Sequence, residues 1–354
     1  MQIAVIGGGI NGVITAWECA KIGHSITLFE QNRLMSATSQ ASTKLLHGGL
    51  RYLEHGEISL VRESLFERSW WLHEVPNIAQ PIEIVFPIYR DSLRHRWKIK
   101  LGMVLYDGLA GRLGIGNHRW LNSGEVLQLI PGLKGKGLQG GYLFYDGQMD
   151  DYSLGCWAAE QAQSAGVKMY EHSRVDRIAA DGIVEVQGIV RKYDRVINVA
   201  GPWAVELLRI SGLPHKHELD LVRGSHLLLD KSSTCGVMLQ VRGDKRICFV
   251  LPYQGKTLLG TTEVRQSLNE PIVCSDSEAE YLMNTYNSYF DSAITQTDVS
   301  SSFAGVRPLI LSQNDPGKAT REYAIEQYGQ LISVFGGKWT TSRALAIKVV
   351  SKLQ

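Results

Sequence analysis

A buried strand, a glycine-rich turn, a helix and a second strand follow one another at the start of the chain, and this unit constrains the fold most. Residues 3–6 (IAVI) are a short apolar run, and residues 7–12 read GGGING. Helical sequence continues to about Lys21, and a second strand, residues 25–29 (SITLF), ends at Glu30. Such a unit is typical of an α/β fold whose parallel sheet binds a dinucleotide.

The residues of this turn and its flanks predict how the dinucleotide is held. Gly7, Gly9 and Gly12 allow a tight turn, close approach of the pyrophosphate and close packing of the helix. The first helical turn, which contains Asn11, directs free N–H groups and the positive end of the helix dipole at the phosphates. Glu30 can accept hydrogen bonds from ribose hydroxyls, which favours a cofactor without a 2′-phosphate. This unit alone does not separate NAD from FAD.

Length and composition set the broad class of protein. A chain of 354 residues is long for one core, so two domains are expected. The net charge of +2 gives no reason to expect nucleic acid as a partner. The five cysteines are far apart and lack CxxC spacing, which indicates reduced thiols in a cytoplasmic protein and no metal site. A strand so close to Met1 leaves no room for a signal peptide, and no apolar run reaches about 18 residues.

The remaining pattern predicts a nucleotide-binding domain that a β-rich domain interrupts twice. Helices are expected at residues 57–71, 151–165, 275–289 and from about 340, and strands at 82–89, 168–171, 195–200, 219–229, 247–251, 258–262, 321–327 and 330–335. We expect an α/β fold with a discontinuous Rossmann-like domain and an antiparallel β-rich α+β substrate (cap) domain. The first comprises residues 1–78, 140–212 and 300–354, and the second 79–139 and 213–299. The Gly-rich residues 132–141 are interpreted as the return to the first domain.

Residues 90–113 combine basic and apolar side chains at helical spacing, among them Arg94, Lys98, Trp97 and Leu101. This pattern predicts a basic amphipathic helix. A solvated face at a domain edge explains it, and so does contact with an anionic membrane surface. We therefore expect a cytoplasmic protein, with peripheral contact to the inner face of the cytoplasmic membrane as the alternative.

Two further segments suit a cofactor. Residues 38–55 (TSQASTKLLHGGLRYLEH) place hydroxyl residues, a Lys, a His, a Gly pair and an Arg together, which suits contact with a cofactor and an anionic substrate. Residues 335–341 (FGGKWTT) repeat the order of strand, glycines and helix start. Free N–H groups there can stabilise negative charge on a reduced cofactor ring. A plain turn capped by Thr340 or Thr341 explains the same residues equally well.

Taken together, the motifs resemble the FAD-dependent glycerol-3-phosphate dehydrogenases, within the D-amino-acid-oxidase-like flavoproteins. The matching segments are residues 7–12, 38–55, 145–151, 198–203, 223–226, 244–246, 260–263, 305–308, 321–323 and 335–341, in the same order along essentially the whole chain. The resemblance implies that the Rossmann-like domain binds FAD and that the enzyme oxidises sn-glycerol 3-phosphate, a small phosphorylated polyol, to dihydroxyacetone phosphate. It implies a membrane quinone or oxygen as the electron acceptor.

The resemblance also implies roles for individual residues. Substrate contacts fall at Arg51, Tyr52, His226, Arg307, Arg321 and Lys338. Flavin contacts fall at Ser39, Ser42, Lys44, His47, Gly48 and Gly49, and Val175 and Ala200 lie near the adenosine end. We also expect cofactor contacts at Gly201, Gly336, Gly337, Lys338, Trp339 and Thr340.

The chain departs from the family pattern at two places. Family members usually continue into a C-terminal helical domain, whereas this sequence ends at Gln354, which predicts a short form without that domain. The family commonly has an Arg two residues after the paired aspartates, where this chain has Ser153. These differences could alter domain contacts, oligomerisation, membrane docking or substrate range.

Oxidation of a secondary alcohol by a flavin needs a base for the hydroxyl proton while hydride leaves for flavin N5. His226 is the first candidate and His47 the second, and for either a structural histidine is the alternative. Arg307 completes the predicted catalytic set, because a phosphate dianion needs several cations whereas a carboxylate is usually held by one Arg. Two other functions stay open: a related flavin oxidoreductase acting on another small 2-hydroxy acid or an amine, and a flavin-binding partner protein without turnover.

Overall fold

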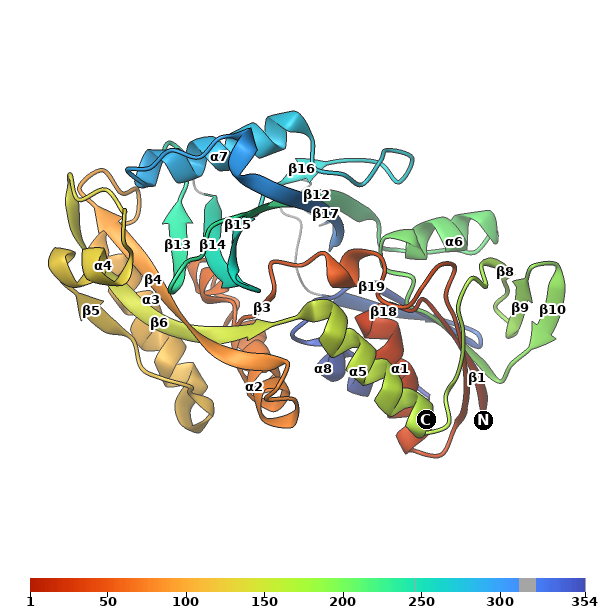
Figure 1. The fold of residues 1–354 in the computed structure, drawn as a ribbon. Helices are drawn as coiled ribbons and strands as arrows, with labels where there is room; N and C mark the ends of the chain where they lie inside the picture. The colour runs from red at the N-terminus through yellow and green to blue at the C-terminus, as the bar shows by residue number, and fades with distance from the viewer. Residues whose placement is uncertain (245, 312–322, 354) are drawn as a thin grey trace.

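A six-stranded sheet surrounds the N-terminal strand β1 (Gln2–Ile6), in the order β18–β19–β11–β1–β2–β7. The computed structural model describes residues 1–244, 246–311 and 323–353 (Figure 1). Neighbouring strands of this sheet are parallel, except that β18 is antiparallel to β19. The other strands are β2 (Ser25–Phe29), β7 (Lys168–Tyr170), β11 (Arg195–Asn198), β18 (Tyr323–Tyr328) and β19 (Leu331–Gly336). This is the parallel sheet that the first 30 residues predict.

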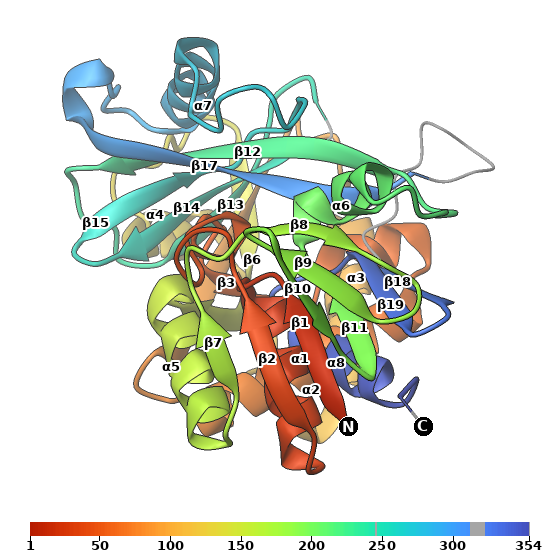
Figure 2. The ribbon, with the colours of Figure 1, turned by 90° about the vertical axis from the view of Figure 1, so that its right-hand side faces the viewer.

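Alternate residues of β1 pack on opposite faces of this sheet, as expected for a strand buried on both sides. Ile3 and Val5 pack with three helices, α1 (Ile10–Lys21), α5 (Asp151–Ser164) and α8 (Ser342–Val350). Ala4 and Ile6 pack with α6 (Ala204–Ile210) and a small antiparallel sheet. That sheet contains β8 (Val175–Ile178), β9 (Ile183–Val186) and β10 (Ile189–Lys192). Figure 2 shows α1, α5 and α8 together on one side of the six-stranded sheet.

The second half of the molecule is a larger sheet in the order β16–β12–β15–β14–β13–β4–β6–β3, with β17 paired to β12 and β5 paired to β6. Its neighbouring strands are antiparallel, apart from the parallel pair β13 and β4. The strands are β3 (Leu45–Leu46), β4 (Ala79–Tyr89), β5 (Arg119–Leu121), β6 (Leu138–Met149), β12 (Leu219–Leu229), β13 (Gly236–Gln240), β14 (Ile247–Tyr253), β15 (Lys256–Gly260), β16 (Val264–Arg265) and β17 (Val299–Ile310).

Helices cover both faces of the larger sheet. α4 (Ser123–Leu129) and α7 (Asp276–Tyr289) share one core with it, and α7 crosses the top of the molecule in Figure 1. α3 (Arg96–Ala110) packs on the opposite face, beside α2 (Ile58–Glu74). The predicted α/β fold with a Rossmann-like domain and a β-rich cap is thus confirmed. Within the described ranges, no helix is both long and apolar enough to cross a bilayer.

One interpretation of the sequence was wrong. Residues 132–141 do not return the chain to the first domain, because β6 begins within them and pairs with β4 along the larger sheet. Two of the glycines there allow close packing: a Cβ at Gly140 would lie 2.3 Å from the carbonyl oxygen of Leu121, and one at Gly141 would lie 2.9 Å from that of Phe86. β6 therefore crosses the predicted domain limit at residue 140. The full set of domain limits stays a prediction.

Candidate active site

One large cavity of about 380 Å³ lies between the six-stranded sheet and the larger sheet. Most of the predicted site residues line it. They are Gly7, Gly9, Asn11, Glu30, Ser39, Ser42, His47, Gly49, Arg51, Tyr52, Val175, Ala200, Gly201, His226, Arg307, Gly336, Gly337, Lys338, Trp339 and Thr340. Gly12, Lys44 and Gly48 do not line the cavity, and Arg321 lies outside the described residues.

The glycine-rich turn is packed too closely for side chains. Gly7 has a φ of +113°, and a Cβ there would lie 2.6 Å from the carbonyl oxygen of Val199. A Cβ at Gly12 would lie 1.9 Å from the carbonyl oxygen of Gly7. Gly12 thus allows α1 to pack against the turn, while Gly7 and Gly9 line the cavity with backbone.

Glu30 connects the end of β2 to this turn. Its Oε2 accepts a hydrogen bond of 2.6 Å from the Gly8 N–H, and its Oε1 accepts one of 2.8 Å from the Asn32 N–H. A carboxylate offers about four lone-pair positions, so these two bonds leave acceptor capacity for ribose hydroxyls. Glu30 thus lies beside the glycine turn, and its contact with a ribose stays a prediction.

The two glycine–helix junctions, at opposite ends of the chain, meet at this cavity. A Cβ at Gly337 would lie 2.7 Å from Asn11 Nδ2, so the start of α1 and the segment before α8 are in contact. Asn11 Oδ1 is buried and has no hydrogen-bond partner among the described residues. Thr341, at the N-cap of α8, makes no capping hydrogen bond through its side chain, which disfavours the plain capped turn.

Segment 38–55 fastens these junctions together. Ser39 Oγ accepts a hydrogen bond of 2.9 Å from the Ile10 N–H, at the start of α1. The carbonyl oxygen of Ser39 accepts one of 2.9 Å from Trp339 Nε1. The same segment therefore holds both the N-terminal turn and residues 335–341.

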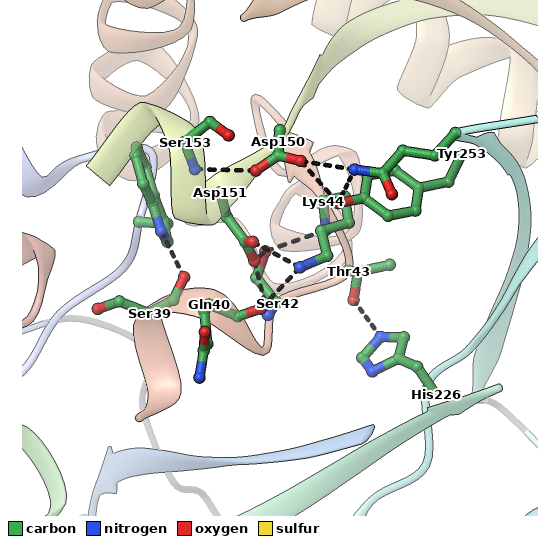
Figure 3. A network of polar contacts seen from close by, with 12 residues as sticks. Ser39, Gln40, Ser42, Thr43, Lys44, Asp150, Asp151, Ser153, His226 and Tyr253 are labelled. Carbon is green, nitrogen blue, oxygen red and sulfur yellow. Dashed lines mark hydrogen bonds and ion pairs between the residues drawn. The ribbon is translucent and has the colours of Figure 1, made fainter. Parts of the chain in front are cut away.

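Lys44, expected at the flavin, instead forms a buried ion pair. Its ammonium donates to Asp151 Oδ1 at 2.5 Å and to the Gln40 carbonyl at 2.6 Å (Figure 3). Asp151 Oδ2 also accepts hydrogen bonds from the Ser42 N–H, at 3.0 Å, and from its hydroxyl, at 2.6 Å. The pKa of Asp151 is raised, because burial outweighs the opposing effect of Lys44. The Lys44 charge is compensated inside the protein rather than directed into the cavity.

Gly48 is held by a second buried network. Its N–H contacts Tyr106 Oη at 2.8 Å and Asp146 Oδ1 at 3.1 Å, and Arg68 Nη1 donates to Asp146 at 2.9 Å. Burial raises the pKa of Asp146, with the charge of Arg68 opposing it. The network fixes the backbone beside His47, so Gly48 shapes the wall without lining it.

His226, on β12, reaches the cavity from the larger sheet. Its side chain is only 1% exposed, its ring stacks on Phe303 at a centroid distance of 4.9 Å, and its Nε2 lies 2.9 Å from Thr43 Oγ1. Gly260 makes room for the ring, because a Cβ there would lie 2.1 Å from His226 Cδ2. Burial, with the nearby charges of Arg307 and Lys44, holds the pKa of His226 well below its usual range. The imidazole is therefore neutral at pH 7, as a base must be.

The predicted cations come from three parts of the chain. Arg307, on β17, donates from Nη2 to Thr261 Oγ1 at 2.8 Å, and its Nη1 lies 3.8 Å from Glu263 Oε1. Lys338 Nζ lies 4.0 Å from the centre of the Tyr52 ring, next to Arg51 in sequence. All of these side chains line the cavity, so three cations from distant parts of the chain share it with the glycine turns.

The family model described as "FAD dependent oxidoreductase" matches residues 2–346. The chain belongs to this family. It is accordingly an oxidoreductase with FAD as cofactor, and the predicted resemblance to glycerol-3-phosphate dehydrogenases is confirmed.

Two curated relatives of this oxidoreductase are informative. The aerobic glycerol-3-phosphate dehydrogenase of Escherichia coli is 35% identical, over 99% of this chain and 73% of its own length. The D-erythritol 1-phosphate dehydrogenase of Brucella abortus is 34% identical, over 100% of this chain and 73% of its own length. A solved structure, the glycerol-3-phosphate dehydrogenase of Bacillus halodurans complexed with FAD, has a TM-score of 0.79 and 26% identity. The chain is covered completely in that comparison and spans 64% of the solved chain.

The cavity of this FAD dependent oxidoreductase fits its cofactor. The glycine backbone and the starts of two helices suit the pyrophosphate of FAD, and Glu30 suits a ribose. Asn11 Oδ1, which has no partner among the described residues, is a buried acceptor for a hydrogen-bond donor of the cofactor. The particular atoms that each residue would contact on FAD stay predictions.

Sequence reasoning missed several residues of the site. Thr43 and Thr261 contact His226 and Arg307, and Glu263 lies beside Arg307. Residues 38–55 and 260–263 were recognised as family segments, yet no role was assigned to these three side chains. The contacts depend on strands that are distant in sequence, so only the order of segments pointed to them.

Proposed function

We propose that this oxidoreductase catalyses FAD-dependent oxidation of sn-glycerol 3-phosphate to dihydroxyacetone phosphate. The observation that carries the proposal is that three cations line the same cavity as the glycine turns. Arg51, Arg307 and Lys338 can share the two charges of a phosphate, for which one bidentate Arg would be insufficient. The relative from Escherichia coli carries the corresponding name.

The charged and titratable residues of the cavity have separate parts in this proposed reaction. Arg51, Arg307 and Lys338 bind the phosphate, and Arg321 is proposed to join them. His226 takes up the proton that the substrate hydroxyl releases. When bound, FAD supplies the group that accepts hydride. His47 lines the same cavity, with its ring centre 6.1 Å from that of Tyr52, and is the second candidate base.

A second substrate deserves a place in the same test. The Brucella abortus relative is named for D-erythritol 1-phosphate, a longer phosphorylated polyol, and is as similar to this chain as the glycerol-3-phosphate dehydrogenases. A phosphate site with a neutral base would serve either alcohol. The test must therefore also distinguish substrates by the length of the polyol.

Anaerobic bleaching of the bound flavin tests the substrate directly. We expect sn-glycerol 3-phosphate to remove the yellow colour, and glycine and lactate to leave it unchanged. Bleaching by D-erythritol 1-phosphate alone would replace the first substrate by the second. If lactate or an amino acid bleached the flavin instead, the phosphate assignment would be wrong. No bleaching by any compound would favour a flavin-binding partner protein.

Arg307→Ala tests the phosphate site. Loss of one charged partner of a buried anion should cost about 3 kcal/mol of transition-state stabilisation. This corresponds to a roughly hundredfold lower kcat/KM for sn-glycerol 3-phosphate. Arg265→Ala removes an Arg that is 69% exposed and paired with Asp220, and should leave the kinetics unchanged. Equal kinetics in the two variants would remove Arg307 from the site.

We also propose that α3 contacts an anionic membrane surface. Trp97, Leu101, Val104 and Leu105 are all exposed, while Ile99 and Met103 face the core. Arg96, Lys98 and Lys100 are exposed on the same helix. Exposed apolar side chains among lysines and arginines suit the boundary between lipid headgroups and acyl chains.

An apolar cavity beneath α3 supports a quinone rather than oxygen as the electron acceptor. It has a volume of about 130 Å³ and is lined mainly by side chains of α3, of the 3-10 helix η2 (Leu50–His55) and of the larger sheet. Leu50, Arg51, Met238 and Ile247 line both this cavity and the main one. A lipid-soluble acceptor would thus approach from the proposed membrane side. Turnover with a soluble naphthoquinone should exceed turnover with dissolved oxygen, and the reverse ratio would contradict this acceptor.

Vesicle sedimentation tests the membrane contact. Phosphatidylglycerol vesicles should bind the protein at least about tenfold more tightly than phosphatidylcholine vesicles at low salt. Trp97→Ser with Leu101→Ser should abolish this binding. Ile189→Ser with Val190→Thr removes two equally exposed apolar residues from β10 and should not. Equal binding by both double variants would exclude α3 as the docking surface.

A further inference from the structure

Thr43 is the polar partner of one ring nitrogen of His226, Nε2. The hydroxyl Oγ1 of Thr43 lies 2.9 Å from Nε2, and both residues line the main cavity (Figure 3). The other nitrogen, Nδ1, is buried and has no hydrogen-bond partner within the described ranges. Because Nδ1 is closed to the cavity, a proton from a ligand would reach the imidazole through Nε2, where the Thr43 hydroxyl already lies.

The structure holds Thr43 in place from both sides. Ser42 and Lys44, its two neighbours, each bind a different oxygen of the buried Asp151 carboxylate. Lys44 has a φ of +59°, the left-handed region that residues with a Cβ rarely occupy. Such backbone persists only where surrounding contacts impose it, and it is concentrated at functional sites. The Lys44–Asp151 pair therefore fixes the backbone that presents Thr43.

His226 is fixed equally well on its own strand. Phe303 stacks on the ring with an interplanar angle of 15°, and Gly260, opposite His226 in the pairing of β12 with β15, makes room for it. The charged groups nearest to the ring are cations, Lys44 paired with Asp151 and Arg307 near Glu263. An imidazolium is thus disfavoured here, and the ring is suited to accept a proton briefly and to release it.

We propose that Thr43 relays the hydroxyl proton of the substrate to His226. As the substrate carbon loses hydride to the flavin, its O–H proton passes to Thr43 Oγ1, and the Thr43 hydroxyl proton passes to His226 Nε2. The substrate loses one hydride and one proton, its C–O bond becomes a carbonyl, and Thr43 ends the step unchanged. Bound FAD would take up the two electrons of the hydride, and the imidazolium later loses its proton to solvent. This inference rests on the proposed oxidation of a phosphorylated alcohol.

Paired substitutions at Thr43 separate a relay from simple packing. Thr43→Val keeps the shape and removes the hydroxyl, whereas Thr43→Ser keeps the hydroxyl and removes a methyl group. In anaerobic stopped-flow experiments on the FAD-loaded protein, Thr43→Val should reduce the flavin with sn-glycerol 3-phosphate about a hundredfold more slowly. Thr43→Ser should stay within about threefold of the wild type and keep its pH profile, since a hydroxyl relay remains. Thr234→Val, at a threonine that does not line this cavity and binds the Leu129 carbonyl, controls for loss of a threonine hydroxyl.

A readout that does not depend on turnover comes from the imidazole. Selective ¹⁵N labelling of histidine in the FAD-loaded protein should show the His226 Nε2 resonance shifted in Thr43→Val and restored in Thr43→Ser. Binding of inorganic phosphate, followed by the flavin spectrum, should be the same in all variants because the cations remain.

The outcomes distinguish this inference from the function on which it rests. Flavin reduction by Thr43→Val at the wild-type rate would overturn the relay, and so would equally slow reduction by Thr43→Val and Thr43→Ser. If sn-glycerol 3-phosphate fails to reduce the wild-type flavin while other polyol phosphates succeed, the substrate is wrong, and the same variants test the relay with the reactive alcohol. An unchanged Nε2 resonance in Thr43→Val would show that the Thr43 hydroxyl does not hydrogen-bond to His226. The relay would then be wrong.

Discussion

The two walls of the main cavity are built in different ways. The wall on the six-stranded sheet, here called the backbone wall, presents main chain at two glycine–helix junctions, where Gly7, Gly9 and Gly337 reach the surface. The wall on the larger sheet consists of side chains, with His226 and Arg307 projecting from neighbouring strands. The first wall suits a cofactor of fixed structure, whereas the second presents the acid–base and charged groups that a reaction needs.

Substitutions at the two walls should therefore have different effects on cofactor binding and on catalysis. Added volume on the backbone wall should expel the cofactor, because nothing there can move aside. Added volume on the side-chain wall should leave the cofactor bound and displace a reacting group. Gly12 and Gly260 lie just behind the two walls, and substitutions of these glycines test the difference.

Gly12→Ala should have the largest effect. Its Cβ would meet the carbonyl oxygen of Gly7 at 1.9 Å, so α1 must shift from the turn. We expect loss of most bound FAD and destabilisation by at least about 3 kcal/mol, the upper range for overpacking. Flavin absorbance per polypeptide and urea unfolding measure both effects. Gly108→Ala in α3, where a Cβ meets nothing within 4 Å, is the matched control and should be neutral or stabilising. Full FAD content in Gly12→Ala would refute the rigidity of this wall.

Gly260→Ala should have the next largest effect and the opposite pattern. Its Cβ would lie 2.1 Å from His226 Cδ2, so the imidazole must leave its position beside Thr43. A displacement of about 1 Å can cost roughly a hundredfold in rate, so we expect such a loss of turnover with FAD content unchanged. Loss of FAD together with activity would show that the two walls do not act separately.

The contrast also explains what the sequence could predict. The backbone wall depends on residues that are neighbours in the chain, so the spacing of Gly7, Gly9 and Gly12 and the position of Glu30 were sufficient. The pairing of residues 335–341 with residues 7–12 was not visible in either segment alone. It follows from the position of β19 two strands away from β1 in the same sheet.

The side-chain wall was predictable only through the family resemblance. Gly260 lies opposite His226, and Arg307 lies opposite Val222, because β12 pairs with both β15 and β17 in a particular register. Register between distant strands cannot be read from composition or spacing. Thr261, which follows β15, was missed for this reason, and Thr43 because the loop that carries it is distant in sequence from β12. The family resemblance assigned Lys44 to the flavin, and its ion pair with Asp151 was not foreseen because that partner is more than 100 residues away in sequence.

Glu278→Gln tests the support behind the side-chain wall. Its carboxylate accepts hydrogen bonds from Ser225 and Thr262, the neighbours of His226 and Thr261, and forms an ion pair with Arg223 at 2.7 Å. Burial opposes ionisation of Glu278, but the hydrogen bonds and Arg223 outweigh it and lower its pKa from 4.5 to about 2.

The stability from this group is present above pH 4.5 and is lost as the pH falls towards 2. Glu278→Gln should therefore unfold roughly 2 kcal/mol more easily at pH 7, with a smaller difference at pH 3. Urea unfolding at the two pH values measures it. Glu280→Gln, two residues further along α7 and exposed, is the matched control. A difference that is the same at both pH values would contradict ionisation of Glu278 as the cause.

The smallest expected effect is the pH dependence that His226 gives to stability. Its pKa is lowered in the folded protein by burial and by Arg307 and Lys44, so below about pH 6.5 the unfolded chain binds a proton that the native imidazole does not. The free energy of unfolding must then fall as the pH drops below 6.5. His226→Gln removes this contribution, so urea midpoints between pH 7 and 5 should decline less in the variant. His95→Gln, an exposed substitution of the same kind, controls for loss of an imidazole. A wild-type protein that gained stability on acidification, relative to His226→Gln, would mean that the ring is charged in the native state and cannot serve as the base.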